Sequence, residues 1–128
     1  MNLLLDTQLL LWSAVAPERL SAAARGLIED DDNVLTFSVV SIWETTIKAN
    51  LGRADFTVDP RRFRIRLLDG GYREMEVTGA HALAVGDLPL LHRDPFDRLL
   101  LAQARVEELV FVTTDRVLAS YPGPIHLV

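Results

Sequence analysis

Short apolar runs alternate with longer segments of helical periodicity along this chain. The apolar runs predict strands at residues 3–5, 34–37, 109–112 and 125–128, with a short strand or sheet edge at 72–77. Helical spacing and capping residues predict helices at residues 9–15, 22–28, 42–49, 60–68, 80–85 and 95–107, and a short one after Asp115. Strands that are apolar throughout and alternate with helices are typical of a parallel sheet covered on both faces. The pattern therefore predicts an α/β fold, a three-layer sandwich around a central parallel sheet.

Composition narrows the class of protein. The chain has 128 residues, of which 49% are hydrophobic and 24% are charged, so we expect one domain over residues 1–128. The lack of cysteine excludes disulfides, thiolate metal sites and a cysteine nucleophile. The three histidines, His81, His92 and His126, do not have the spacing of a zinc site. We find no signal peptide and no apolar stretch long enough to cross a membrane, and we expect a soluble, cytoplasmic protein.

Acidic residues stand at or near the expected carboxyl ends of the strands. Asp6 directly follows the first strand, and Asp115 follows the strand at 109–112 across two threonines. Glu44 lies on the helix after the second strand, and Asp97 lies in the first turn of the helix that precedes 109–112. Because the carboxyl ends of parallel strands meet at one edge of a sheet, we expect these four side chains to converge.

Four carboxylates in one place repel each other, and some must take up a proton unless a cation intervenes. Mg²⁺ or Mn²⁺ suits such a site, because both ions prefer oxygen ligands. A bound divalent ion lowers the pKa of its water and neutralises charge that builds on a phosphoryl group. The acids therefore predict a metal-dependent hydrolase of phosphodiester bonds.

Each acid also has an ordinary structural interpretation. Asp6 and Asp115 could cap the helices that follow them. Ser41 and Glu44 have the spacing of a capping box, and Glu44 stands four residues before Lys48, a spacing that allows a surface ion pair. For Asp94, which precedes a proline at a helix start, the cap is the favoured role.

Four segments of the chain resemble, in order, the motifs of PIN-domain ribonucleases, and most of all those of VapC-type toxins from toxin–antitoxin pairs. They read LLDTQLLLW at 4–12, SVVSIWETTIK at 38–48, HRDPFDR at 92–98 and VTTDR at 112–116. Together they span nearly the whole chain. Gln8 departs from the family, which often carries histidine there, but this position is not an expected metal ligand.

The resemblance implies a PIN-like, Rossmann-related fold and an endoribonuclease that depends on Mg²⁺ or Mn²⁺. It assigns the metal to Asp6 and Asp97, while Glu44 and Asp115 complete the catalytic pocket directly or through water. It also implies a homodimer and a cognate antitoxin protein that silences the toxin. A PIN-like interaction module without catalysis is the alternative, against which the presence of all four acids weighs. A phosphotransferase with Asp6 as acceptor lacks its second acid, because position 8 is Gln.

The net charge of −5 does not favour RNA binding, so attraction must be local. Arg93, Arg98 and Arg116 flank the expected acidic pocket in the sequence and are the expected substrate-binding residues. The arginines between residues 61 and 66 could line an approach path for RNA, form a solvated helix face or meet the antitoxin. Trp12 and Trp43 could stack on bases, but their apolar helical surroundings favour the core. We expect His81 and His92 on the surface or in loops, without a catalytic role.

Overall fold

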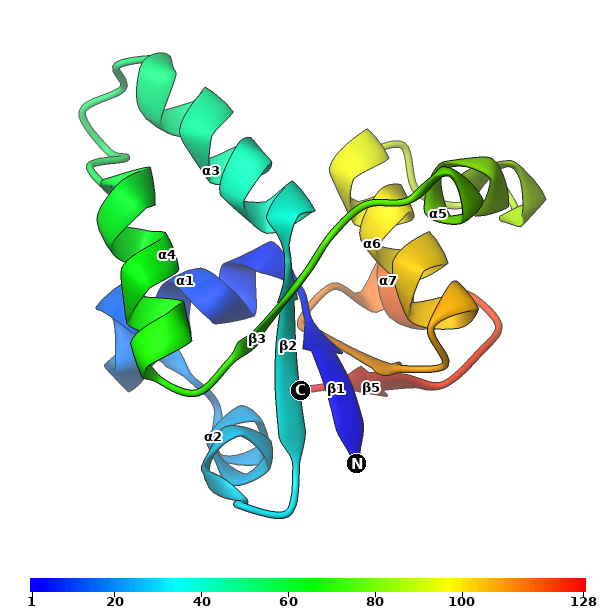
Figure 1. Ribbon diagram of the computed structural model, residues 1–128, viewed down its shortest axis with the longest axis horizontal. Coiled ribbons are helices and arrows are strands. Elements are labelled where there is room, and N and C mark those ends of the chain that lie inside the picture. Colours follow the sequence, from blue (N-terminus) through cyan, green and yellow to red (C-terminus); the bar gives the residue numbers. More distant parts are fainter.

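A five-stranded parallel sheet forms the centre of the computed structural model, which describes residues 1–128 (Figure 1). The strand order is β3-β2-β1-β4-β5, and every neighbouring pair is parallel. The strands are β1 (Asn2–Leu5), β2 (Val34–Ser38), β3 (Arg73–Met75), β4 (Val110–Thr113) and β5 (Ile125–Leu127). The predicted parallel sheet is therefore confirmed, including the short edge strand within 72–77.

Helices cover both faces of this sheet. They are α1 (Thr7–Val15), α2 (Ala22–Glu29), α3 (Val39–Asn50), α4 (Pro60–Asp69), α5 (Gly79–Ala84), α6 (Pro95–Val106) and α7 (Arg116–Ala119). Two short 3₁₀ turns, η1 (Pro17–Arg19) and η2 (Val85–Asp87), complete the elements. In Figure 1, α1, α2 and α4 lie on one side of the strands, while α5, α6 and α7 lie on the other. None of these helices has both the length and the apolar character needed to cross a membrane.

The core divides into two clusters because successive strand residues face opposite sides of a sheet. Leu3 and Leu5 of β1 pack with residues of α1, α2 and α4, whereas Leu4 packs with residues of α6 and α7. All three leucines are fully buried. This alternation buries both faces of the sheet against helices. It also sets the direction of Asp6, the residue that follows β1.

The start of α3 differs from the predicted one. Ser38 at the end of β2 caps the helix by accepting a hydrogen bond from the backbone N–H of Val40. Ser41 is instead a buried residue inside the helix, where its hydroxyl lies 2.8 Å from that of Thr7. The capping-box interpretation of Ser41 and Glu44 is therefore wrong, because the strand passes into the helix without an intervening loop. The ion pair between Glu44 and Lys48 is present.

The burial of two side chains, His81 and Trp43, differs from the prediction. His81 is only 1% exposed and caps α5, where its Nδ1 accepts the backbone N–H of Thr78 and its Nε2 lies 2.8 Å from Glu107. Trp43 is 57% exposed, whereas Trp12 is half-buried against the core as predicted. Trp43 lies outside the core because the buried face of α3 carries Val40 and Glu44 instead.

Candidate active site

A cleft of about 270 Å³ lies at the edge of the sheet where β1 and β4 end. It brings together the four predicted acids, Asp6, Glu44, Asp97 and Asp115. A fifth acid, Asp94, also lines it, and Lys48 is the one basic residue among the lining side chains. The convergence expected from the parallel topology is therefore present, and the cleft is strongly negative.

Asp6 is fixed in place by three donors. One oxygen, Oδ1, accepts the backbone N–H of Leu9 at 2.9 Å and so caps α1. The other, Oδ2, accepts the hydroxyl of Thr113 at 2.6 Å and the backbone N–H of Thr114 at 3.3 Å. Burial nevertheless raises the pKa of Asp6 above its usual value, because these hydrogen bonds do not fully offset it and the charge of Asp115 adds to it. Asp6 therefore has both the capping role and a place in the cleft.

Glu44 has one oxygen that nothing in the chain satisfies. Its side chain is 7% exposed, and Oε2 accepts a 2.8 Å hydrogen bond from Nζ of Lys48. The second oxygen, Oε1, is buried and has no hydrogen-bond partner. Burial of an unpaired carboxylate oxygen costs folding free energy. A bound cation or hydrogen-bond donor at Oε1 would offset this cost.

The third acidic segment contributes two carboxylates from the N-terminus of α6. Oδ1 of Asp94 caps the helix by accepting the backbone N–H groups of Phe96 and Asp97, which leaves Oδ2 without a protein partner. Asp97 forms no hydrogen bond through its carboxylate, and its pKa rises to about 7. Burial is the main cause, and repulsion from Asp94, Glu44 and Asp6 adds to it while His92 partly opposes it.

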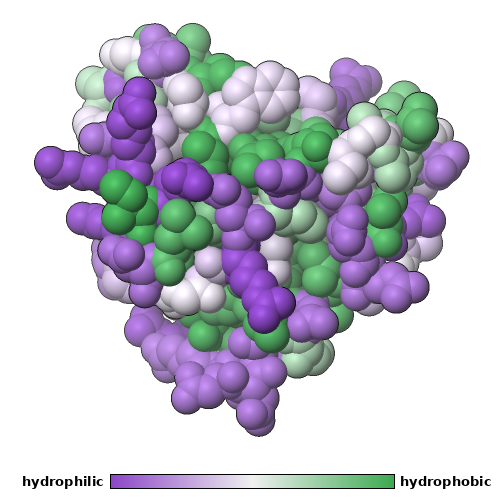
Figure 2. Space-filling view, in the orientation of Figure 1, coloured by the Kyte–Doolittle hydropathy of each residue, from purple (hydrophilic) through white to green (hydrophobic).

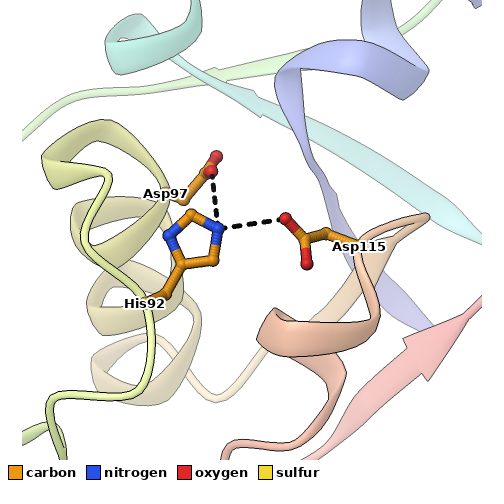
Figure 3. Close-up of side chains that lie close together, drawn as sticks. All are labelled: His92, Asp97 and Asp115. Atoms are coloured by element: carbon orange, nitrogen blue, oxygen red, sulfur yellow. Dashed lines mark hydrogen bonds and ion pairs between the residues drawn. The ribbon is translucent and has the colours of Figure 1, made fainter.

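Asp115, unlike Asp6 and Asp97, is an acid of the cleft whose charged form the protein stabilises, in part through a contact with His92 (Figure 3). Oδ1 accepts the backbone N–H groups of Val117 and Leu118 and so caps α7. Oδ2 lies 3.0 Å from Nε2 of His92. Burial raises the pKa of Asp115, but the hydrogen bonds from His92 and from the two amides outweigh it and leave the pKa below its usual value.

His92 lies in a loop, as the sequence predicted, but its side chain faces the acids of the cleft. Its side chain is 17% exposed, and Nε2 also lies 3.6 Å from Oδ2 of Asp97. Sequence reasoning missed this residue because it belongs to a loop without periodicity. Its position two residues before the helix cap Asp94 is the one local signal, since Nδ1 accepts the N–H of Asp94.

The chemistry of the donor set fits Mg²⁺ or Mn²⁺. Unclaimed carboxylate oxygens remain on Glu44, Asp94 and Asp97, and the raised pKa of Asp97 reflects negative charge that the chain itself does not neutralise. Hard divalent cations prefer such all-oxygen sites, and the chain contains no cysteine to favour a softer metal. The cleft can therefore hold a divalent cation beside an oriented set of proton acceptors.

The three arginines predicted to bind substrate have different surroundings. Arg93 and Arg116 are exposed and form no ion pair with an acidic residue. The guanidinium of Arg98 instead donates to the backbone oxygens of Val85 and Pro89 and to the hydroxyl of Tyr121. These contacts hold the loop before α6, so the position of Arg98 favours a structural role over the predicted contact with substrate.

The five-stranded parallel sheet with helices on both faces agrees with comparisons to known proteins. The family model described as PIN domain matches residues 3–124. The chain belongs to the PIN domain family. A comparison with curated protein sequences finds no match.

Two solved structures share the fold of this PIN domain. The crystal structure of VapBC2 from Rickettsia felis bound to a promoter DNA fragment is similar at a TM-score of 0.70 and 14% identity, over 100% of this chain and 98% of that one. A toxin–antitoxin complex from Klebsiella pneumoniae is similar at a TM-score of 0.61 and 17% identity, over 95% of this chain and 93% of that one. At these identities the likeness concerns the fold.

Proposed function

We propose that this PIN domain is a Mg²⁺- or Mn²⁺-dependent endoribonuclease that acts as the toxin of a toxin–antitoxin pair. One observation carries the proposal: Glu44 has a buried oxygen without a donor in a cleft that holds five carboxylates and a single lysine. A protein that only contacts other proteins has no evident need for such a site, because the unpaired charges cost folding free energy.

In this proposal Asp6 and Asp97 hold the cation, and Glu44 and Asp115 complete the site. A bound Mg²⁺ or Mn²⁺ would stabilise charge on the scissile phosphate and lower the pKa of its water. Three hydrogen bonds fix Asp6, so its carboxylate stays in place when phosphate approaches. Lys48 keeps Oε2 of Glu44 in place, and Oε1 is the oxygen left to bind or to accept a proton.

The surroundings of the cleft suit an RNA chain better than the net charge suggests. Arg93 and Arg116 are exposed and carry no acidic partner, so both are available to phosphate groups. Trp43, next to Glu44 in the sequence, contacts Phe96 edge to face with ring centroids 4.9 Å apart. Figure 2 shows hydrophobic side chains at the surface between the positions that α3 and α6 have in Figure 1. An exposed indole beside a hydrolytic cleft is suited to stack on an unpaired base.

The expected protein partners are a cognate antitoxin and a second copy of this chain. Support for the antitoxin comes from the two similar structures, of which one is VapBC2 and the other is a toxin–antitoxin complex. The homodimer is the one that the resemblance to VapC-type toxins implies. Co-purification with the product of a neighbouring small reading frame tests the first partner, and sedimentation of the purified protein tests the second.

The nuclease is tested with Asp6→Asn and Asp97→Asn in an RNA cleavage assay with Mn²⁺. Both variants remove a charge without a large change of shape, and both are expected to lose cleavage at least about 100-fold, in the range typical of metal-site residues. Addition of EDTA to the unmodified protein is expected to do the same. Asp31→Asn is the matched control, because Asp31 is an exposed acid in a turn away from the cleft.

Calorimetry with Mn²⁺ separates the nuclease from the alternative, a PIN-like interaction module without catalysis. The nuclease predicts Mn²⁺ binding that Asp6→Asn and Asp97→Asn abolish. Binding that is absent, or unchanged in both variants, contradicts the proposal and favours the interaction module.

A further inference from the structure

We propose that His92 is a positioning residue of this site: its Nε2–H holds the carboxylate of Asp115 in the orientation used for cleavage. The proposal rests on the nuclease function above, and it concerns a residue for which we expected no catalytic role. His92 lies in the loop before α6, and Asp115 lies at the end of β4, so the contact joins two segments of the cleft that are 23 residues apart (Figure 3).

The hydrogen bonds of the ring determine which nitrogen carries the proton. Nδ1 lies 3.1 Å from the backbone nitrogen of Asp94, and a backbone N–H can only donate, so Nδ1 accepts. The proton therefore sits on Nε2, which donates to Oδ2 of Asp115 at 3.0 Å. A nitrogen that carries a proton has no lone pair for a metal ion. His92 is thus a hydrogen-bond donor to the carboxylates and not a ligand beside them.

A buried tyrosine, Tyr121, holds the backbone of the loop that carries the His92 ring. The backbone N–H groups of Leu91 and His92 donate to the hydroxyl of Tyr121 at 3.2 Å and 2.8 Å. Arg98 donates to the same hydroxyl at 3.1 Å, and Tyr121 belongs to the core cluster of α6 and α7. The loop that carries His92 is therefore anchored to the core, although it has no regular secondary structure.

The consequence for Asp115 is a carboxylate with little freedom to rotate. Two backbone amides hold Oδ1, and His92 holds Oδ2. Each carboxylate oxygen can accept two hydrogen bonds, so Oδ2 keeps one lone pair to orient water or to accept a proton. Without His92, Oδ2 has no donor from the protein and the carboxylate is held at one oxygen only.

Two substitutions of His92 separate its two nitrogens. In His92→Gln the side-chain amide can place an N–H near the position of Nε2, so the donor to Asp115 is retained. In His92→Asn the shorter amide can still accept the N–H of Asp94, but it does not reach Asp115. We expect His92→Asn to lower kcat for RNA cleavage roughly 10–100-fold, as for other residues that orient a metal site, and His92→Gln to restore most of it.

Three further measurements distinguish positioning from folding and from metal binding. We expect the KM for RNA and the melting temperature of His92→Asn to match the unmodified protein, and its Mn²⁺ affinity in calorimetry to stay within about tenfold. The proposal is overturned if His92→Asn cleaves at the unmodified rate, or if His92→Gln is as slow as His92→Asn. Loss of Mn²⁺ binding as complete as in Asp97→Asn also overturns it, because His92 would then be a ligand. If Asp6→Asn cleaves normally as well, the nuclease function itself fails, which is a separate result.

Discussion

The hydroxyl of Thr113 donates a 2.6 Å hydrogen bond to Oδ2 of Asp6, across 107 residues of sequence. The same oxygen of Thr113 accepts the backbone N–H of Asp115 at 3.0 Å. Thr113 therefore connects the acids at the ends of β1 and β4, the two central neighbours in the sheet. The bond lies in the buried floor of the cleft, where an unsatisfied carboxylate oxygen is expensive.

Replacement of Thr113 by valine tests this connection. Thr113→Val keeps the branched shape and removes the hydroxyl, so we expect the free energy of unfolding in EDTA to fall by about 1–3 kcal/mol. We also expect weaker Mn²⁺ binding, since Asp6 loses one of its three donors. Urea unfolding and calorimetry measure the two effects. Thr57→Val makes the same chemical change at an exposed position and should alter neither. Unchanged stability and affinity in Thr113→Val would contradict the role assigned to the hydroxyl.

The raised pKa of Asp97 predicts how the metal-free protein responds to pH. The folded protein holds this proton up to about pH 7, whereas the ordinary value of the carboxyl is 3.8. Stability from this group is therefore complete below the unfolded pKa and is lost as the pH rises through 7. In EDTA at pH 8, the free energy of unfolding of Asp97→Asn should exceed that of the unmodified protein by roughly 2 kcal/mol. This difference should shrink toward pH 4.

With Mg²⁺ or Mn²⁺ present, the unmodified protein should instead be more stable than Asp97→Asn. At pH 8 either ion should raise the melting temperature of the unmodified protein and have little effect on Asp97→Asn. Thermal unfolding at pH 5 and pH 8, with EDTA or with Mn²⁺, measures all four conditions. A pH dependence that is the same in both proteins would show that Asp97 is not the group that titrates.

Trp43 should contribute to RNA affinity and little to stability. Its indole is mostly exposed, so removal leaves no large cavity, while stacking on a base is worth about 1–3 kcal/mol. We expect Trp43→Ala to raise the KM for single-stranded RNA roughly 5- to 100-fold with kcat nearly unchanged. Leu51→Ala removes another exposed apolar side chain from the end of the same helix and serves as the control. If Trp43→Ala changes the sedimentation coefficient and not the KM, the indole belongs to a protein interface.

The convergence of acids could be predicted from the sequence because it depends on topology alone. Once Asp6 follows β1 and Asp115 follows β4, parallel pairing of the two strands places both at one edge. The exposure of Trp43 could not be predicted in this way. Helical periodicity indicates that one face of α3 is apolar, but it does not indicate that only part of this face is covered by neighbouring helices.

The role of His92 was beyond sequence reasoning for a different reason. Its position depends on Tyr121, which lies 29 residues later in the chain and outside every acidic motif. The same limit applies to His81, which we expected on the surface or in a loop. Its burial depends on Gln103 and Glu107 of the next long helix and its end, whose facing side chains the local sequence does not specify.

His81 provides a test in which stability and activity should separate. It joins α5 to the end of α6, because Nδ1 accepts the backbone N–H of Thr78 and Nε2 bonds to Glu107. His81→Ala removes both contacts from a buried site, so we expect a loss of about 1–3 kcal/mol in the free energy of unfolding. The residue does not line the cleft, so kcat and Mn²⁺ affinity should be unchanged at temperatures where the variant is folded. His126→Ala, at an exposed position, should change neither quantity. A fall in kcat of folded His81→Ala would show that the helix pair controls the geometry of the acidic cleft.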